Sequence, residues 1–324
     1  MPHPSRRALL SLLPTLAALP AAAQGFTPER PVRVIVPFAA GASMDSIARL
    51  LGRALEPRWG QPIVVENRTG AGGNIGAAAV AQAAPDGLTL LIAAAGMMTV
   101  SPHLYRDLPF DFARDLAPVA MLGTIPNVMV VPPASPARDV AGFLAAQRAA
   151  GRPMTYGSPG SGSYIHVTGE LFARETGLAA EHVAYRGSAP ALIDLSAGRL
   201  DVMFENLPGA LPFIRDGRLR ALAVTSPERS PLLPEVPTTS EAGLPGVQAV
   251  AWFAAYAPGR TPLALRQRIA ADIATVQRGE EGARGLGALG LTVSIMDPEA
   301  LGTMVDRERD RFGAIVRAAN ITLQ

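Results

Sequence analysis

Short apolar runs alternate with helix-like patterns along most of the chain. The first series begins with an apolar run at 32–36, after which Ile47, Leu50, Leu51 and Leu55 recur at helical spacing. Strands are predicted over 32–36, 62–66, 88–93, 128–131, 154–157, 182–185, 202–205 and 219–225. Helices are predicted after residue 43 and over 75–83, 140–149, 164–176, 189–196, 211–216, 262–278 and 298–319. Strand–helix–strand repeats of this length predict two successive units with mostly parallel sheets, an α/β fold.

The N-terminal segment, residues 1–23, has the three parts of a secretion signal. Arg6 and Arg7 precede an apolar stretch over 8–19, and small residues at 21–23 predict cleavage after Ala23. The apolar stretch is shorter than the ~20 residues that span a bilayer. Residues 5–10 also resemble a loose twin-arginine signal, so the general secretory (Sec) and twin-arginine export routes both stay open. Export to the periplasm is therefore predicted.

Charge and composition exclude several classes of function. The chain has 29 Lys+Arg and 27 Asp+Glu, and removal of the two arginines in residues 1–23 leaves 27 of each. The mature chain therefore has no excess of positive charge of the kind that indicates nucleic-acid binding. The sequence contains no lysine and no cysteine, which excludes Walker A and Schiff-base lysines, thiol nucleophiles and thiolate metal sites. The three histidines after the signal have no metal-ligand spacing, so neither a metal nor another cofactor is expected.

Three turns that follow predicted strands carry the candidate chemistry. The small-residue turn after 32–36 opens a helix, whose free backbone N–H groups suit a carboxylate or phosphate. The Gly-rich turn at 70–74 superficially resembles a dinucleotide fingerprint, but Ile75 stands where the third glycine is required, so a tight structural turn is favoured. The third turn, at 156–166, offers hydroxyls and N–H groups for a second anion cradle.

The same third turn also permits a hydrolase interpretation. Ser158, Ser161 and Ser163 lie close to His166, and Ser163 with His166 would be the nucleophile and base. The strained Gly-x-Ser-x-Gly elbow is absent, which favours a ligand cradle or a structural role over catalysis.

Later turns place further polar residues on the ligand side of the second unit. In open α/β sheets ligands lie beyond the carboxyl ends of strands, which selects Gly187, Ser188, Ala189, Glu205 and Asn206. Several alternatives stay open. Ser188 is also a candidate helix N-cap, Glu205 an ion-pair partner and Asp45 a first-turn acid facing a helix dipole; Trp252 and Phe253 are either core or an apolar wall of the pocket.

The motifs, in this order and spacing, resemble the substrate-binding proteins of tripartite tricarboxylate transporters, the Bug family. They are Val34-Ile-Val-Pro-Phe38 with Asp45 downstream, residues 65–76, 85–90, 156–158, 166–172, 185–191, 206–208 and 219–226. The resemblance implies a two-domain periplasmic-binding-protein (Venus-flytrap) fold, with a ligand cleft between the domains and no catalytic turnover. It divides the chain into the signal peptide 1–23, a discontinuous domain 1 over 24–124 plus 227–324, and domain 2 over 125–226. The two crossings between domains are then expected near 123–127 and 224–227.

The resemblance also implies the site. The first and third loops of domain 1 would hold a carboxylate through backbone amides, hydroxyls and waters: Phe38, Ala39, Gly41, Ala42, Ser43, Asp45, Ala95, Gly96 and Met97. The opposing cradle in domain 2 would consist of Ser158, Gly162, Ser163, His166, Arg186, Gly187, Ser188, Ala189, Glu205 and Asn206. A monomeric receptor that delivers a small carboxylate to membrane permease subunits is the implied function, with a ligand-presenting sensory protein as the alternative.

Two departures from the family pattern bear on the ligand. Ala42 replaces a usual glycine and is strained by ~1 kcal/mol if that position needs a positive φ. Met97 and Met98 stand where hydroxyl residues are common, which predicts a more apolar cleft. The expected ligand therefore has an aromatic or aliphatic body and one or two carboxylates.

Overall fold

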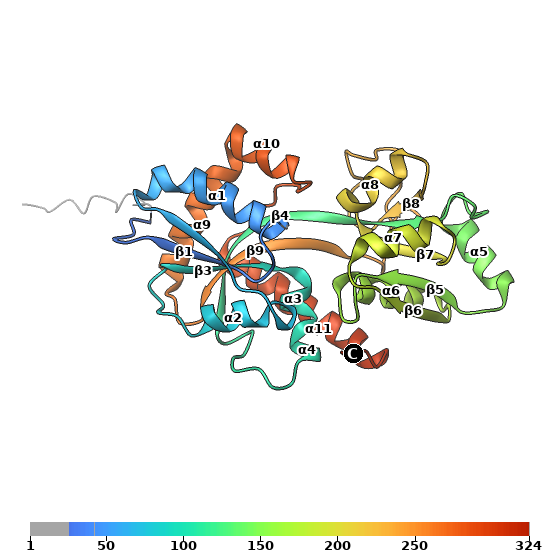
Figure 1. Cartoon of the computed structure of the whole chain (residues 1–324), viewed down its shortest axis with the longest axis horizontal. Coiled ribbons are helices and arrows are strands. Elements are labelled where there is room, and N and C mark those ends of the chain that lie inside the picture. The colour runs from blue at the N-terminus through green and yellow to red at the C-terminus, as the bar shows by residue number, and fades with distance from the viewer. Residues whose placement is uncertain (1–25, 42, 324) are drawn as a thin grey trace, which may run out of the picture.

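The structure, a computed structural model, describes residues 26–41 and 43–323. The predicted signal peptide and the predicted strain at Ala42 lie outside the described residues. The described chain forms two lobes, and two long strands run between them (Figure 1). These are β4 (Leu116–Val131) and β9 (Val250–Pro258).

The first lobe contains both ends of the described chain. Its sheet has the order β2-β1-β3-β9-β4, parallel among β1, β2 and β3 and antiparallel from β3 through β9 to β4. One face is covered by α1, α9 and α10, and the other by α2, α3 and α11. The bounds of its other elements are β1 Val32–Val36, α1 Ser43–Trp59, β2 Ile63–Asn67, η1 Ala71–Gly73, α2 Asn74–Ala81, β3 Thr89–Ala94, α3 Ala95–Thr99, α4 Ser101–Leu104, α9 Leu263–Arg278, α10 Glu280–Ala288 and α11 Pro298–Ala318.

The second lobe repeats the plan on a smaller scale. Its sheet has the order β4-β7-β5-β6, with β8 also pairing with β4. Helices α5 and α6 contribute to the core on one face, and α7 and α8 to the core on the other. The bounds are α5 Val140–Ala150, β5 Met154–Ser158, α6 Tyr164–Thr176, β6 Ala180–Ala184, α7 Ser188–Ser196, β7 Val202–Asn206, α8 Leu207–Arg215 and β8 Arg220–Val224.

Strand β4 belongs to both sheets. Residues 116–126 pair with β9 in the first lobe, and from Asn127 onward the strand pairs with β7 and β8 in the second. The crossing expected near 123–127 therefore lies on β4. The other crossing is the entry to β9 near Val250 rather than 224–227. Leu233, Val236 and Val247 pack in the cores of the second lobe, so residues 227–249 contact that lobe, whereas the predicted division places them in domain 1.

The observed sheet is mixed, not mostly parallel, because β9 and β4 run antiparallel to their neighbours. The hydrophobic pattern did not predict β9. Its run Val-Ala-Trp-Phe-Ala-Ala-Tyr-Ala-Pro is apolar at nearly every position, and a strand buried on both faces lacks the alternation that marks a half-exposed strand.

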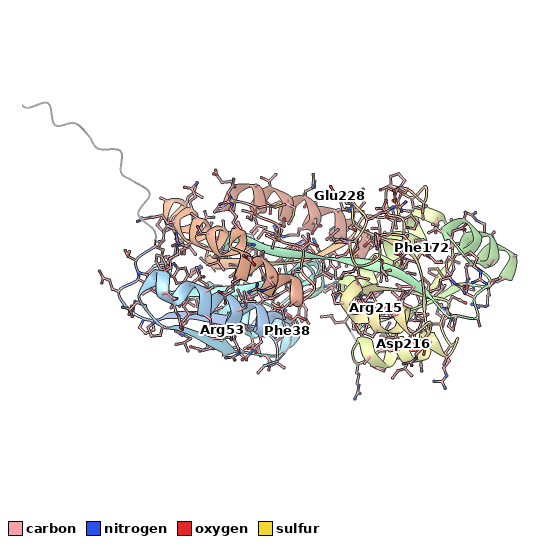
Figure 2. The ribbon with its side chains drawn as sticks, turned by 90° about the horizontal axis from the view of Figure 1, so that it is seen from above. Phe38, Arg53, Phe172, Arg215, Asp216 and Glu228 are labelled. Carbon is pink, nitrogen blue, oxygen red and sulfur yellow. The ribbon has the colours of Figure 1, made fainter. Side chains whose placement is uncertain are left out.

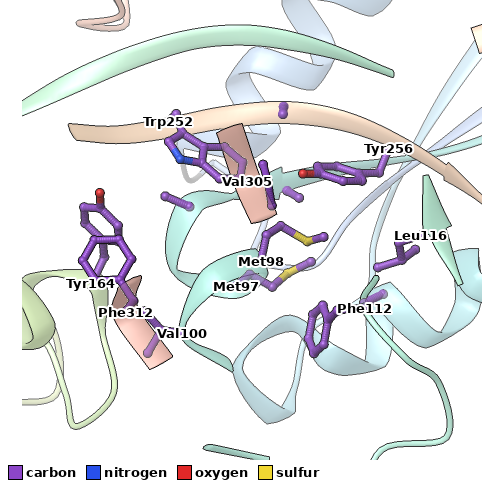
Figure 3. Packing of buried hydrophobic residues seen from close by; sticks show 14 of the residues in the cluster. Met97, Met98, Val100, Phe112, Leu116, Tyr164, Trp252, Tyr256, Val305 and Phe312 are labelled. Atoms are coloured by element: carbon purple, nitrogen blue, oxygen red, sulfur yellow. The ribbon is translucent and has the colours of Figure 1, made fainter. Parts of the chain in front are cut away.

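The lobes contact each other where α6 begins. The Tyr164 hydroxyl donates to the Val250 carbonyl at 3.1 Å, and its ring meets Phe312 of α11 edge-on at 5.1 Å (Figure 3). From the same helix, Arg311 donates to the carbonyls of Gly246 and Gln248 at 2.7 and 2.8 Å. Helix α11 therefore fastens the first lobe to the segment that leads into β9.

Candidate functional site

The turn between β1 and α1 lies at the end of the first lobe that faces the second, as the position of Phe38 in Figure 2 shows. Phe38 is 38% exposed, and Ala39, Ala40 and Gly41 are also exposed. Gly41 has a φ of +82°, a conformation that favours glycine and lets the chain turn tightly into the helix. Helix α1 then begins at Ser43, so its first backbone N–H groups lie in this turn.

The buried side chain of Asp45 holds this turn in place by hydrogen bonds. Its carboxylate, 3% exposed, accepts hydrogen bonds from the Gly41 amide at 2.9 Å, from Arg49 at 2.9 Å and from the Asn67 side chain at 3.0 Å. The Arg49 guanidinium, first among these donors, lowers the pKa of Asp45 to about 2. Both carboxylate oxygens are engaged within the lobe, so the contacts seen here position the turn.

Asn67 is a positioning residue that the sequence did not single out. Besides Asp45, its amide donates to the Phe38 carbonyl at 3.0 Å. The sequence feature that could have identified Asn67 is its position directly after the second predicted strand, at the same edge of the sheet as the turn.

The other two loops of the first lobe support the turn from behind. A Cβ on Gly73 (φ +98°) would lie 2.9 Å from the sulfur of Met97 and 3.2 Å from Pro37, which explains the glycine at this position structurally. Ala95 and Met97 are 2% and 4% exposed, and Met98 is fully buried, in the core shown in Figure 3. The prediction that Met97 and Met98 give an apolar ligand surface is therefore wrong, because both side chains complete the hydrophobic core. Gly96 is half-buried and reaches the second lobe: a Cβ there would lie 3.4 Å from Tyr164.

In the second lobe, two stacked histidines hold the turn between β5 and α6. The rings of His166 and His182 lie 3.6 Å apart and almost parallel. His166 Nδ1 accepts from the Gly162 amide at 3.0 Å, and His182 Nε2 lies 2.6 Å from the hydroxyl of the buried Ser158. Burial, and for His166 also the neighbouring His182, lower the pKa of His166 to about 3; burial lowers that of His182 to about 4. The pair is therefore neutral at ordinary pH.

These contacts give Ser163 and His166 structural tasks. Ser163 is the N-cap of α6, and its hydroxyl accepts from the His166 backbone amide at 3.2 Å. The acceptor nitrogen of the His166 ring already receives the Gly162 amide proton, so this geometry does not pair Ser163 with a general base. His182, which the sequence did not suggest, could be found only through its register with Tyr156 on the paired strand.

The β6–α7 and β7–α8 turns complete the same edge of the second lobe. Gly187 has a φ of +112°, and Ser188 begins α7; Arg186 and Ala189 are exposed. Glu205 at the end of β7 is 2% exposed, and its Oε1 accepts from the Asn206 amide at 3.0 Å. Burial raises the pKa of Glu205 to about 7, against the opposing influence of the Ser188 hydroxyl and the Asn206 amide. The predicted ion pair of Glu205 is not found among the described residues.

Most of the predicted site residues lie in turns at one edge of each lobe, whereas Ala95 and Met97 belong to the hydrophobic core and Ala42 is outside the described residues. The contact between Gly96 and Tyr164 joins the two edges at one point, and a Cβ at Gly290 of the first lobe would overlap the ring of Pro208, the second residue of α8. Trp252 and Phe253 belong to the cores on opposite faces of the first lobe. Within 26–41 and 43–323, no group of three or more His, Asp or Glu side chains is placed to hold a metal ion. No helix of the same ranges is long and apolar enough to cross a membrane.

Comparisons with known proteins agree with this architecture. A family model described as the tripartite tricarboxylate transporter family receptor matches residues 47–321. BugT of Bordetella pertussis is 36% identical over 298 residues, which are 92% of this chain and 91% of that protein. A Rhodopseudomonas palustris protein solved with adipate is 34% identical, with a TM-score of 0.77 over 92% of this chain and 99% of its own. MatC of the same organism, solved with bound malate, is 32% identical, with a TM-score of 0.73 over 89% and 99%. These matches confirm the predicted family, the fold class and the interpretation as a binding protein without enzymatic turnover.

Proposed function

Because this chain belongs to the tripartite tricarboxylate transporter receptor family, we propose that it captures a small carboxylate in the periplasm and delivers it to a membrane transporter of the same system. The observation that carries the proposal is the pair of turns on the facing edges of two lobes that β4 and β9 connect. Such an arrangement lets a ligand bind one lobe and then be enclosed by the other. Relatives solved with adipate and malate support a carboxylate ligand.

In this proposal the turn between β1 and α1 binds one carboxylate of the ligand. The N-terminus of α1 supplies N–H donors and a partial positive charge, while the Gly41 amide is bonded to Asp45. Asp45 keeps these donors in place, and its partner Arg49 is occupied by that task. Neutral donors then hold the carboxylate, with Phe38 beside it as an apolar contact and the turns of the second lobe closing over its far end.

Location and partners belong to the same proposal. The predicted signal in residues 1–23 would direct the chain to the periplasm by either export route, and the mature receptor would act as a monomer. Transport and sensing are separated by one assay. Uptake of the ligand by vesicles that contain the cognate permease should depend on added receptor, and uptake that is independent of it would favour the sensory alternative.

Binding is tested by calorimetry on protein purified from the periplasm without denaturation and then dialysed. The titrants are linear and aromatic mono- and dicarboxylates, with sugars and neutral amides as controls. At least one acid should bind and raise the unfolding midpoint, since a ligand at 100 times its Kd stabilises by about 2.7 kcal/mol. If no carboxylate binds while a neutral solute does, the proposal is wrong.

A further inference from the structure

Helix α6 of the second lobe also contributes to the core of the first. Tyr164, Val167 and Leu171 follow the i, i+3, i+7 spacing of one helix side, and each is at most 9% exposed. They pack in one apolar cluster with residues of α11, among them Phe312, which Figure 3 shows against Tyr164. Another side of the helix carries Phe172, which belongs to the second lobe's own core. Helix α6 is therefore packed between the two lobes.

Residues of the first lobe also contact the turn that precedes α6. A Cβ on Gly162 would overlap the side chain of Leu104 from α4 and would lie 3.5 Å from Leu323, near the C-terminal end of the described chain. The backbone of Gly96 approaches the start of the helix, since a Cβ there would lie 3.4 Å from Tyr164. The β5–α6 turn and the start of α6 therefore touch the first lobe at several points.

The lobes keep separate cores on the other side of the connecting strands, where α1, α10 and α8 lie (Figure 1). The cluster that α1, α9 and α10 cover contains only residues of the first lobe, and the cluster that α7 and α8 cover contains only residues of the second. Within 26–41 and 43–323, no hydrogen bond joins α7 or α8 to the first lobe. Pro208, at the start of α8, does approach Gly290 of the first lobe. The two sides of the molecule therefore join the lobes to different extents.

This asymmetry determines where the lobes can part with the smaller loss of packing. Separating α6 from α11 would expose apolar side chains that are now buried against each other, and burial of apolar surface is the dominant favourable contribution to packing. Separating α7 and α8 from the first lobe would leave the clusters on that side intact. Strands β4 and β9 connect the lobes in either case.

We propose that the lobes open and close about the contact between α6 and α11, which acts as the fulcrum. The β7–α8 turn then moves away from the first lobe and back, whereas the β5–α6 turn stays in contact with it. A solute enters between α8 and the side of the first lobe that carries α1 and α10. The inference rests on the proposed function for the solute that favours the closed form, while the position of the fulcrum follows from the packing alone.

The test measures two distances in the full protein by pulsed electron paramagnetic resonance between spin labels. The sequence contains no cysteine, so introduced cysteines are the only labelling sites. The outer pair combines Arg53→Cys on α1 with Arg215→Cys on α8, at two exposed residues that Figure 2 labels. The fulcrum pair combines Arg174→Cys on α6 with Ala318→Cys on α11, at two exposed residues that line one hollow between these helices.

Without added solute, the outer pair should give the broader distribution of distances. Whichever of adipate, malate and terephthalate binds in calorimetry should shorten the outer distance by roughly 5 Å or more and change the fulcrum distance by less than about 2 Å. An unchanged outer distance on binding, or a fulcrum distance that changes as much, would overturn the inference. If no carboxylate binds, the proposed function fails, and the widths of the two distributions still decide the inference: equal widths would contradict it.

A matched pair of variants tests whether apolar packing forms the fulcrum. Leu171→Ala removes contacts between α6 and the cluster of the first lobe, so the distance distribution of the fulcrum pair should broaden. Leu195→Ala removes a leucine of α7 that is also buried, but in the second lobe's own core, and should leave this distribution unchanged. Equal effects of the two variants would contradict the assignment. If Leu171→Ala does not fold, Val167→Ala, which removes a smaller side chain from the same cluster, takes its place.

Discussion

The two lobes brace corresponding turns in chemically opposite ways. In the first lobe a charged network holds the β1–α1 turn, with buried Asp45 receiving Gly41, Arg49 and Asn67. In the second lobe a neutral stack of His166 and His182 holds the β5–α6 turn. A carboxylate with a lowered pKa and two imidazoles with lowered pKa values respond to different ranges of pH. The difference teaches that similar strand–turn–helix patterns can be stabilised by unrelated side chains.

The largest loss of stability is expected when Asp45, which holds the β1–α1 turn, is replaced. Asp45→Ala leaves the Gly41 amide and Asn67 without their acceptor and Arg49 without its partner, so the free energy of unfolding should fall by about 3 kcal/mol. Urea denaturation measures this loss. Asp45→Asn, which keeps an acceptor but not the charge, should lose less; equal losses would show that the charge, and not the hydrogen bonds, holds the turn.

The histidine pair should make the second lobe lose stability first as pH falls. Both folded pKa values lie below the ordinary 6.5, so the unfolded chain takes up protons first. The contribution of the histidine pair is full above pH 6.5 and is lost as pH falls towards 4, on the order of 2 kcal/mol after allowance for solvent screening at the half-buried His182. Glu205 of the same lobe, with its pKa raised from 4.5 to about 7, opposes this loss between pH 7 and 4.5, so the response is measured locally at the turn that the histidines hold. The contribution of Asp45, whose pKa is lowered from 3.8 to about 2, is lost only as pH falls from about 4 to about 2.

Hydrogen exchange measures the pH response of each lobe separately. Between pH 6.5 and 4, after correction for intrinsic rates, peptides over 154–184 should lose protection while those over 31–67 keep it. His182→Phe, which retains a stacked ring but cannot titrate, should flatten the response. Equal loss of protection in both lobes would contradict the comparison.

A smaller effect is expected at the contact between the lobes. Tyr164→Phe removes only the hydrogen bond to the Val250 carbonyl and keeps the ring against Phe312, so it should cost about 1 kcal/mol. Thermal unfolding measures the loss. Tyr105→Phe, at a half-buried tyrosine of the first lobe whose hydroxyl has no hydrogen bond recorded among the described residues, is the control. A cost as small as that of the control would show that the packing of the Tyr164 ring, and not its hydrogen bond, stabilises this contact.

The smallest effect is expected at the cap of α6. Ser163→Ala removes the hydroxyl that accepts the His166 amide and should lower stability by about 0.5–1 kcal/mol, as measured by urea denaturation. Ser163→Asp, which also caps, should restore it. The stack of His166 and His182 still holds the turn in this variant. A loss of stability as large as that of Asp45→Ala would therefore mean that the histidine stack depends on this cap.

Much of the fold followed from local pattern, whereas much of the site did not. The predicted strand over 32–36 matches β1, and the predicted helix over 164–176 matches α6. Met97 and Met98 proved to be core residues, because their side chains complete a cluster with α11 that no local pattern shows. Likewise, residues 227–249 pack on the second lobe through Leu233, Val236 and Val247, and most of the core residues that they contact come from distant parts of the sequence.

The sequence by itself determined the alternation of strands and helices, the turns that open helices on free N–H groups, and the family. These depend on periodicity and on residues close in the chain. Only the tertiary structure decided which polar groups are already satisfied and which are not. One of the three partners of Asp45, Asn67, is 22 residues away, and the partner of Tyr164, Val250, is 86 residues away. Oε2 of Glu205 and Oδ1 of Asn206 have no hydrogen-bond partner in the part of the chain that the structure describes. Asn67 reaches Asp45 because β1 and β2 pair side by side, and Tyr164 reaches Val250 where α6 meets the start of β9, so groups that hold the turns can be recognised only in the folded molecule.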